Sequence, residues 1–196
     1  MNKDLISSLR PAVVMTLLFA LLLGIAYPLA LTGIGQIVFP HQANGSLIED
    51  HGKVVGSELL AQGFASDRYF HPRPSAAGKG YDPLASAGSN LGPASQALHD
   101  RVAGDIKTLQ ASVPGSSVPL DLVTASASGL DPDITPEAAL YQVPRVARAR
   151  GIEERRLRAI VADATAHPLL GFLGEDRVNV LLLNRQLDSE SAKPTK

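Results

Sequence analysis

Residues 11–31 read PAVVMTLLFALLLGIAYPLAL, and no charged side chain interrupts them. As a helix, about 21 residues rising about 1.5 Å each span about 31 Å, which matches the hydrocarbon thickness of a bilayer. A helix packed on a protein core would carry a polar face, and this stretch carries none. The stretch therefore predicts a transmembrane helix.

The alternative is a secretory signal peptide that is removed after export. Such a peptide has a shorter apolar core and ends at a small-x-small cleavage site. Here the apolar core is long, and residues 27–31 (YPLAL) offer no clear Ala-x-Ala sequence. The pattern favours a retained helix, and Pro28 is expected to break or kink its outer end.

The charges on the two flanks of the helix predict its orientation. Lys3 and Arg10 precede it against Asp4 alone, whereas the opposite flank carries Glu49 and Asp50 and no Lys or Arg as far as His51. The positive-inside rule then places the N-terminus in the cytoplasm and the remaining chain outside. We expect a cytoplasmic tail (1–10), a transmembrane helix (11–31), a periplasmic α+β domain (32–188) and a flexible tail (189–196).

Composition limits what the domain can do. The chain has 196 residues, a formal net charge of -1 and no cysteine. Disulfide bonds and thiolate chemistry are therefore excluded, and without a basic stripe nucleic acid is not an expected partner. About 150 residues outside the membrane are enough for one domain with its own core.

The pattern of apolar and turn-forming residues predicts a mixed domain of helices and strands. Apolar residues at three- and four-residue spacing indicate amphipathic helices, whereas short apolar runs next to turn residues indicate strands. Pro144 lies inside one predicted helix and is expected to kink or split it. The predicted elements are a hairpin (46–58), helices (93–113, 135–150 and 153–166) and strands (118–124 and 178–183).

Two loops rich in small residues carry the candidate functional side chains. Residues 71–95 contain too much proline, glycine and serine for a regular helix or strand. A long loop inside a compact domain is usually functional, and aromatic anchors predict that this one is ordered and faces a partner. Its candidates are Arg73, Ser75, Tyr81, Asp82, Ser86, Ser89 and Asn90. A second loop (125–132) and the residue before it add Thr124, Ser126, Ser128 and Asp131.

Signatures of independent catalysis are absent from the sequence. There is no P-loop, no dinucleotide fingerprint and no nucleophile elbow, and the five histidines are scattered. We predict no catalytic residue, no metal site and no directly bound cofactor, and a docking role for the polar loops. A membrane-tethered periplasmic enzyme or binding domain that uses the loop from Arg73 to Asn90 remains the alternative.

Six blocks of the sequence form a recognisable series: YFHPRPSA (69–76), GYD (80–82), SNLGP (89–93), DLVTASASGLDP (121–132), RVARARG (145–151) and LGFLGEDRVNVL (170–181). Together these blocks resemble the C-subunit family (KdpC) of the Kdp potassium-transporting ATPases. They keep the family's order along most of the chain, and a single N-terminal membrane helix agrees with them. Ala87 and Ala127 stand where the family often has glycine.

This resemblance implies a non-catalytic subunit in a bacterial inner-membrane complex for high-affinity potassium uptake. The family's partners are a channel-like, potassium-binding subunit (KdpA), the P-type ATPase subunit (KdpB) and a small subunit (KdpF). The complex uses ATP, Mg and K. The chain lacks the Asp-Lys-Thr-Gly-Thr phosphorylation motif, so it is not expected to hydrolyse ATP itself.

Two roles have been proposed for proteins of this family. One is a catalytic chaperone that raises the affinity of the pump subunit for ATP, and the other is an extracytoplasmic cap near the potassium entrance. A domain outside the membrane cannot share a nucleotide with a cytoplasmic site. Any effect of the domain on ATP affinity would have to be transmitted through its membrane helix or another subunit, as a coupling free energy. We therefore favour a structural or entrance-cap role.

Overall fold

The computed structural model describes residues 2–191, with the side chains of residues 7–190. The chain divides into two compact units that meet between Leu47 and Ile48. The first unit is built around one long helix, and the second is a domain of helices and short strands. The expected class, an N-terminal apolar helix followed by one α+β domain, is confirmed.

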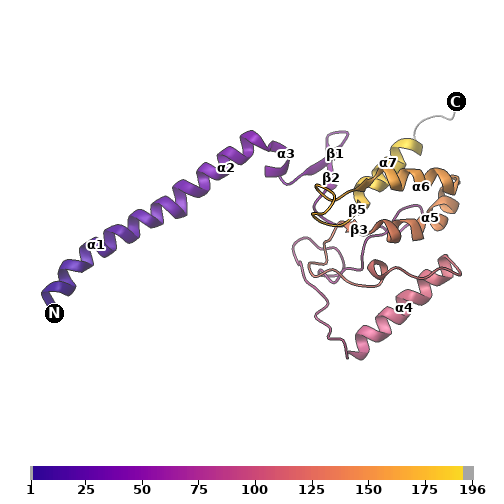
Figure 1. Ribbon diagram of the computed structural model, residues 1–196, viewed down its shortest axis with the longest axis horizontal. Coiled ribbons are helices and arrows are strands. Elements are labelled where there is room, and N and C mark those ends of the chain that lie inside the picture. The colour runs from indigo at the N-terminus through magenta and orange to yellow at the C-terminus, as the bar shows by residue number, and fades with distance from the viewer. Residues whose placement is uncertain (1, 192–196) are drawn as a thin grey trace. The chain divides into compact units, whose positions relative to one another are not determined.

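The long helix exceeds the predicted span at both ends. Helix α1 (Asn2–Leu21), one π-helical turn η1 (Leu22–Ala26) and α2 (Tyr27–Val38) follow one another as a continuous rod (Figure 1). Its apolar part, Ser7–Val38, has 32 residues, and the most apolar 18-residue window within it has a mean hydropathy of 2.3 and is not buried in the protein. By length and composition this helix can cross a membrane.

Pro28 does not end the helix, contrary to the expected break. Proline has no N–H to donate to the carbonyl of Gly24, so a regular turn loses one hydrogen bond there. The chain meets the proline directly after the π turn, in which the Tyr27 N–H bonds to Leu22 O, five residues back. Pro28 then occupies the first turn of α2, where a missing N–H is tolerated.

A short helix, α3 (Pro40–Ala43), leads into the predicted hairpin, which is confirmed as β1 (Leu47–Asp50) paired with β2 (Lys53–Ser57). The two connecting residues, His51 and Gly52, have φ angles of 48° and 76°. Positive φ at both central positions is the turn geometry that suits the twist of a two-stranded ribbon.

The domain's larger helices follow the predicted ones closely, and their bounds are α4 (Gln96–Ser112), α5 (Pro136–Arg150) and α6 (Glu154–Asp163). Thr135 caps α5, because its hydroxyl accepts the Ala138 N–H at 3.2 Å. Gly151 ends α5 in the left-handed conformation, with φ at 68°. Pro144 does not split α5, which is assigned as one helix through that position.

A small antiparallel sheet lies beside these helices. Strand β5 (Arg177–Asn179) is central, between β3 (Asp133–Ile134) and β4 (Thr165–Ala166). Helices α5 and α6 pack against each other and, with the sheet and α7 (Val180–Ser191), enclose the core (Figure 1). Its largest fully buried side chains are Phe70, Val143, Val146, Leu157, Val161, Val178, Leu183, Asn184 and Leu187.

The strand predicted at 118–124 is wrong. This segment forms a single 3₁₀ turn, η2 (Leu120–Leu122). Pro119 cannot donate to a strand partner, and the backbone N–H and hydroxyl of Thr124 both bond to Leu120 O, at 2.9 and 2.8 Å. Local hydrogen bonds thus close a turn where the apolar pattern indicated an extended chain.

The strand predicted at 178–183 is mostly wrong, because only its first two residues belong to β5 and the rest begin α7. The side chain of Asn179 accepts the Leu182 N–H at 3.1 Å, which caps the new helix. Helix α7 continues to Ser191, so residues 189–191, expected in a flexible tail, are helical. Residues 192–196 lie outside the described residues.

Candidate functional site

The two loops named from the sequence lie against each other along what we call the loop seam, residues 73–90 and 124–131. Ser75 is its central polar contact, because its hydroxyl donates to Gly129 O at 2.6 Å and accepts the N–H groups of Ala77 and Tyr81 at 3.1 and 2.8 Å. One side chain thereby fixes three backbone groups. These hydrogen bonds hold the two loops in place although neither loop forms a helix or strand.

Arg73 joins the seam at one end. Its Nη1 lies 3.0 Å from Asp131 Oδ2, and its Nε and Nη2 reach the backbone and hydroxyl oxygens of Thr124 at 3.4 Å. The Tyr81 hydroxyl donates to Arg73 O at 2.9 Å. Burial raises the pKa of Tyr81, which keeps this hydroxyl protonated as a donor.

The other end of the seam is held through backbone groups. Ser86 Oγ and the Ala87 N–H both donate to Ser128 O, at 2.9 and 3.0 Å. Gly129 has a φ of 68°, and a Cβ atom there would lie 2.7 Å from Ala77 N and 2.8 Å from Ala87 O. Only a residue without a side chain allows the two loops to approach this closely.

The remaining predicted residues have smaller roles in holding the loops. Asp82 caps a turn by accepting the Leu84 N–H at 2.9 Å, and the hydroxyls of Ser126 and Ser128 are 3.5 Å apart. Within residues 2–191, the side chains of Ser89 and Asn90 make no hydrogen bond to another residue. Whether these candidates contact a partner stays a prediction.

The outer side of the seam is open to solvent. Leu84 is 96% exposed at a loop tip. A shallow groove of about 570 Å³ runs along the second loop and is lined by Arg73, Ser126, Ser128 and Asp131 together with apolar residues. The seam thus presents an exposed leucine and a partly apolar groove to solvent.

Sequence reasoning missed the strap that precedes the seam, residues 67–71. Two buried amide side chains hold its backbone as a neighbouring strand would. Asn184 accepts the Phe70 N–H at 2.8 Å and donates to Phe70 O at 2.9 Å. Gln142 does the same for His71, at 2.8 and 3.0 Å. No local pattern identifies such amides, because only the tertiary fold brings them to the strap.

Two arginines of α5 also grip the strap. Arg145 donates to the carbonyl oxygens of Asp67 and Tyr69 at 2.9 and 3.0 Å. Arg150 donates to Arg68 O at 2.6 Å, and its guanidinium lies 4.9 Å from the centre of the Tyr69 ring. Both arginines fall in the block RVARARG (145–151), but their use was not foreseen.

The strap predicts a pH dependence of stability. Burial, and secondly the charge of Arg145, lower the pKa of His71 below its ordinary value, and its Nε2 lies 3.2 Å from Ser66 O. At mildly acidic pH the His71 imidazole is therefore protonated more readily in the unfolded chain than in the folded chain. The contribution of neutral His71 to the free energy of unfolding is complete above about pH 6.5 and is lost as the pH falls through the pKa of His71 in the folded chain. Urea unfolding of the full chain in detergent at pH 7 and pH 5 should show a smaller loss for His71→Gln than for the wild type. An equal loss would contradict this role.

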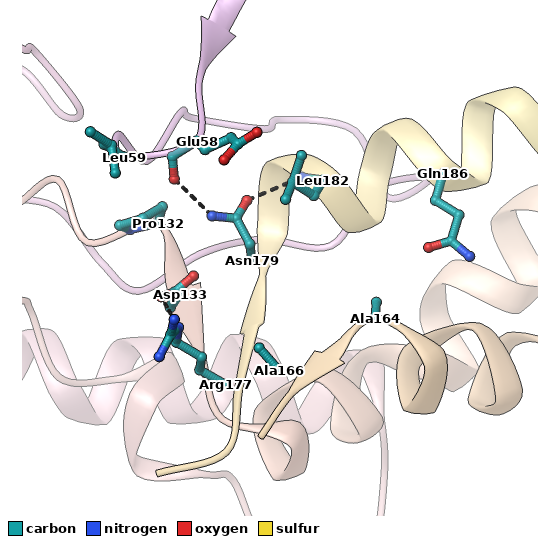
Figure 2. A pocket seen from close by; sticks show the side chains of 10 residues that line it. All are labelled: Glu58, Leu59, Pro132, Asp133, Ala164, Ala166, Arg177, Asn179, Leu182 and Gln186. Atoms are coloured by element: carbon teal, nitrogen blue, oxygen red, sulfur yellow. Dashed lines mark hydrogen bonds and ion pairs between the residues drawn. The ribbon is translucent and has the colours of Figure 1, made fainter. Parts of the chain in front are cut away.

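A second groove, of about 580 Å³, lies where β3, β5 and α7 meet (Figure 2). Asn179 bridges its wall by donating to Glu58 O at 2.8 Å, and Arg177 Nε pairs with Asp133 Oδ2 at 3.2 Å. Burial raises the pKa of Asp133, although Arg177 opposes that shift. Asn179, Arg177 and Asp133 are thus engaged in contacts that hold the walls of this groove together.

The serine hydroxyls of the seam take part in structural hydrogen bonds. The hydroxyls of Ser75 and Ser86 donate to backbone carbonyl oxygens, which leaves neither paired with a base as a nucleophile must be. Within the described residues, no group of three or more His, Asp or Glu side chains is placed to hold a metal ion. What the arrangement offers is a rigid, partly polar surface.

Among the described residues, one helix is able to cross a membrane, and together with one domain that has a firmly held loop surface it fits a single-pass membrane protein. The family model described as "K+-transporting ATPase, c chain" (KdpC) matches residues 9–189. The chain therefore belongs to the KdpC family of potassium-transporting ATPase subunits.

Relatives named "Potassium-transporting ATPase KdpC subunit" cover nearly all of the chain. The one from Caulobacter vibrioides (strain NA1000 / CB15N) is 56% identical over 186 residues, 94% of each chain. The one from Rhodopseudomonas palustris (strain BisB18) is 53% identical over 197 residues, 94% of this chain and 99% of its own. The one from Methylobacterium nodulans is 53% identical over 201 residues, 96% and 100% of the two chains.

Proposed function

We propose that this chain is a non-catalytic accessory subunit of an ATP-driven potassium uptake complex, in which it assembles with the channel-like KdpA, the ATPase KdpB and the small KdpF. The family match over residues 9–189 is the observation that carries this proposal. A single helix supports it as well, because one span alone has no interior through which an ion could pass.

We propose further that the domain lies outside the cytoplasm and acts at the potassium entrance. The flanking charges support this orientation. An outside domain cannot touch the nucleotide of a cytoplasmic ATPase site. In this topology the chaperone role would require a coupling through the membrane, whereas an entrance cap requires only a firm outer surface, which the loop seam provides.

Copurification tests the assembly. A tagged full chain isolated from native membranes in mild detergent should bring two large membrane subunits with it. A chain that is isolated alone and shows hydrolase activity would instead support the tethered enzyme. Within the intact complex, a photoreactive ATP analogue should label KdpB and leave this domain unlabelled, and labelling of the domain would overturn the entrance-cap role.

Arg73 gives a sharper test of the cap. Arg73→Gln leaves Asp131 without its cation and should loosen one end of the seam, at a cost of about 1 kcal/mol because the pair is partly exposed. We expect a several-fold higher potassium concentration for half-maximal ATPase activity of the complex, with the half-saturating ATP concentration unchanged. A chaperone would show the reverse pattern.

Arg155→Gln is the matched control for Arg73→Gln. Arg155 is exposed on α6, and its side chain makes no hydrogen bond or ion pair within the described residues. Its removal changes the net charge equally and should leave both half-saturating concentrations unchanged. The double variant Arg73→Gln with Asp131→Asn should recover part of the loss, because no unpaired charge then remains in the seam.

A further inference from the structure

The connection between β4 and β5, residues 167–176, is a hairpin-like loop to which the proposed function assigns no role. Its base is fixed by the antiparallel pairing of Ala166 with Arg177, both visible in Figure 2. His167 Nδ1 lies 2.7 Å from Asp176 Oδ1, and a further antiparallel bridge joins Leu169 to Leu173. The loop is therefore a small structured hairpin.

The tip of this hairpin is apolar and exposed. Leu169, Leu170, Phe172 and Leu173 are 70%, 74%, 72% and 53% exposed. Four large apolar side chains within five residues, all in water, are unfavourable for an isolated domain, since each would gain about 1.5–3 kcal/mol on full burial. A contiguous patch of this kind marks an interaction site.

The backbone of the tip is also held in an unfavourable conformation. Leu170 has a φ of 58°, in the left-handed region that branched side chains avoid. Such a residue costs about 1–2 kcal/mol, and strain of this kind is concentrated at sites that bind something. Glycine at position 170 would relax this turn but would carry no side chain. The strained turn instead keeps an exposed leucine there.

The charges around the tip indicate what it binds. Glu175 and Asp176 adjoin it and are exposed, and Asp176 already contacts His167. The nearest arginine or lysine in the sequence, Arg177, pairs with Asp133 at 3.2 Å. An anionic lipid surface would repel these carboxylates, and the basic residues that membrane-binding loops use are missing here. The complementary surface is an apolar protein pocket with basic residues on its rim.

We propose that Leu169, Leu170, Phe172 and Leu173 form the apolar anchor by which this domain docks onto another subunit of the potassium-transporting ATPase. This inference rests on the proposed function, which supplies the partner. Few residues carry most of the energy of an interface, and aromatic and apolar anchors inserted into a pocket are typical of them.

Photocrosslinking tests the anchor in the assembled complex. A benzophenone amino acid at Phe172 should give, on irradiation, an adduct of this chain with a second subunit, identified by mass spectrometry. The same probe at Lys107, on the exposed face of α4, is the control and should give several-fold less. A lipid adduct alone, or no adduct in a complex that copurifies intact, would overturn the anchor and leave the proposed assembly standing.

Substitution gives a second readout. Phe172→Asp should reduce the copurified partner subunits about tenfold or more, whereas Phe172→Leu should retain most of them. Because the side chain is exposed, both variants should unfold at the wild-type urea concentration, so a loss of partners cannot come from misfolding. Full copurification of Phe172→Asp would contradict the proposal, and absence of partners from the wild type would refute the assembly itself.

Discussion

Replacing Gly129 by alanine is expected to lower the free energy of unfolding of the domain by about 3 kcal/mol and to open the loop seam. Part of this cost, about 1–2 kcal/mol, comes from a φ of 68° that a residue with a Cβ atom disfavours. The remainder comes from the contacts of 2.7 and 2.8 Å that the new methyl group would make with Ala77 N and Ala87 O. Urea unfolding of the full chain in detergent measures the change.

Gly151→Ala separates the two contributions. Gly151 has the same φ of 68°, but nothing lies within 4 Å of the Cβ position there. We expect a loss of about 1 kcal/mol from Gly151→Ala, with copurification of partner subunits unchanged, whereas Gly129→Ala should impair copurification strongly. If the two variants are equally destabilised, the close approach of the loops at Gly129 contributes nothing and the seam is looser than described.

The membrane-spanning helix and helices α4, α5 and α6 were predictable because each carries a signal that is complete in itself. The apolar length of the membrane-spanning helix, the Thr135–Pro136 start and the Gly151 stop depend only on neighbouring residues. The run 180–183 misled for the same reason. A few consecutive apolar residues fit a buried strand or a helix, and here burial of Leu183 and Leu187, four residues apart, decides for the helix.

The two loops of the candidate site were predictable from the sequence, but the contacts between them were not. Composition indicated two loops, aromatic anchors predicted that the first is ordered, and Arg73, Ser75 and Asp131 were among the candidates. Nothing in the sequence, however, pairs Ser75 with Gly129, 54 residues away. Such a contact depends on how the core places the two loops. Gln142 and Asn184 were missed because a buried amide has no sequence signature, and only its partner reveals its role.

Asn184→Leu is the second large expected effect, a loss of about 3–5 kcal/mol in the free energy of unfolding. Asn184 is 1% exposed and satisfies both backbone groups of Phe70, which is itself completely buried. Leucine has nearly the same size, so packing is kept while a buried N–H and a buried C=O lose their partners, at about 1–3 kcal/mol each. Urea unfolding of the full chain in detergent gives the difference.

Gln186→Leu is the control on the same helix, because Gln186 is half-buried and its side chain holds no strap residue. It should change stability by less than about 0.5 kcal/mol. Gln142→Leu, which frees His71 in the same way, should cost about as much as Asn184→Leu, but the double variant should cost less than the sum. The two amides hold adjacent residues, Phe70 and His71, at the same end of the five-residue strap. Once one amide is lost, the other holds a segment that is already loosened. Additive losses would mean that Phe70 and His71 are held independently, and the strap would then not be the single unit that carries the chain from the core into the loop seam.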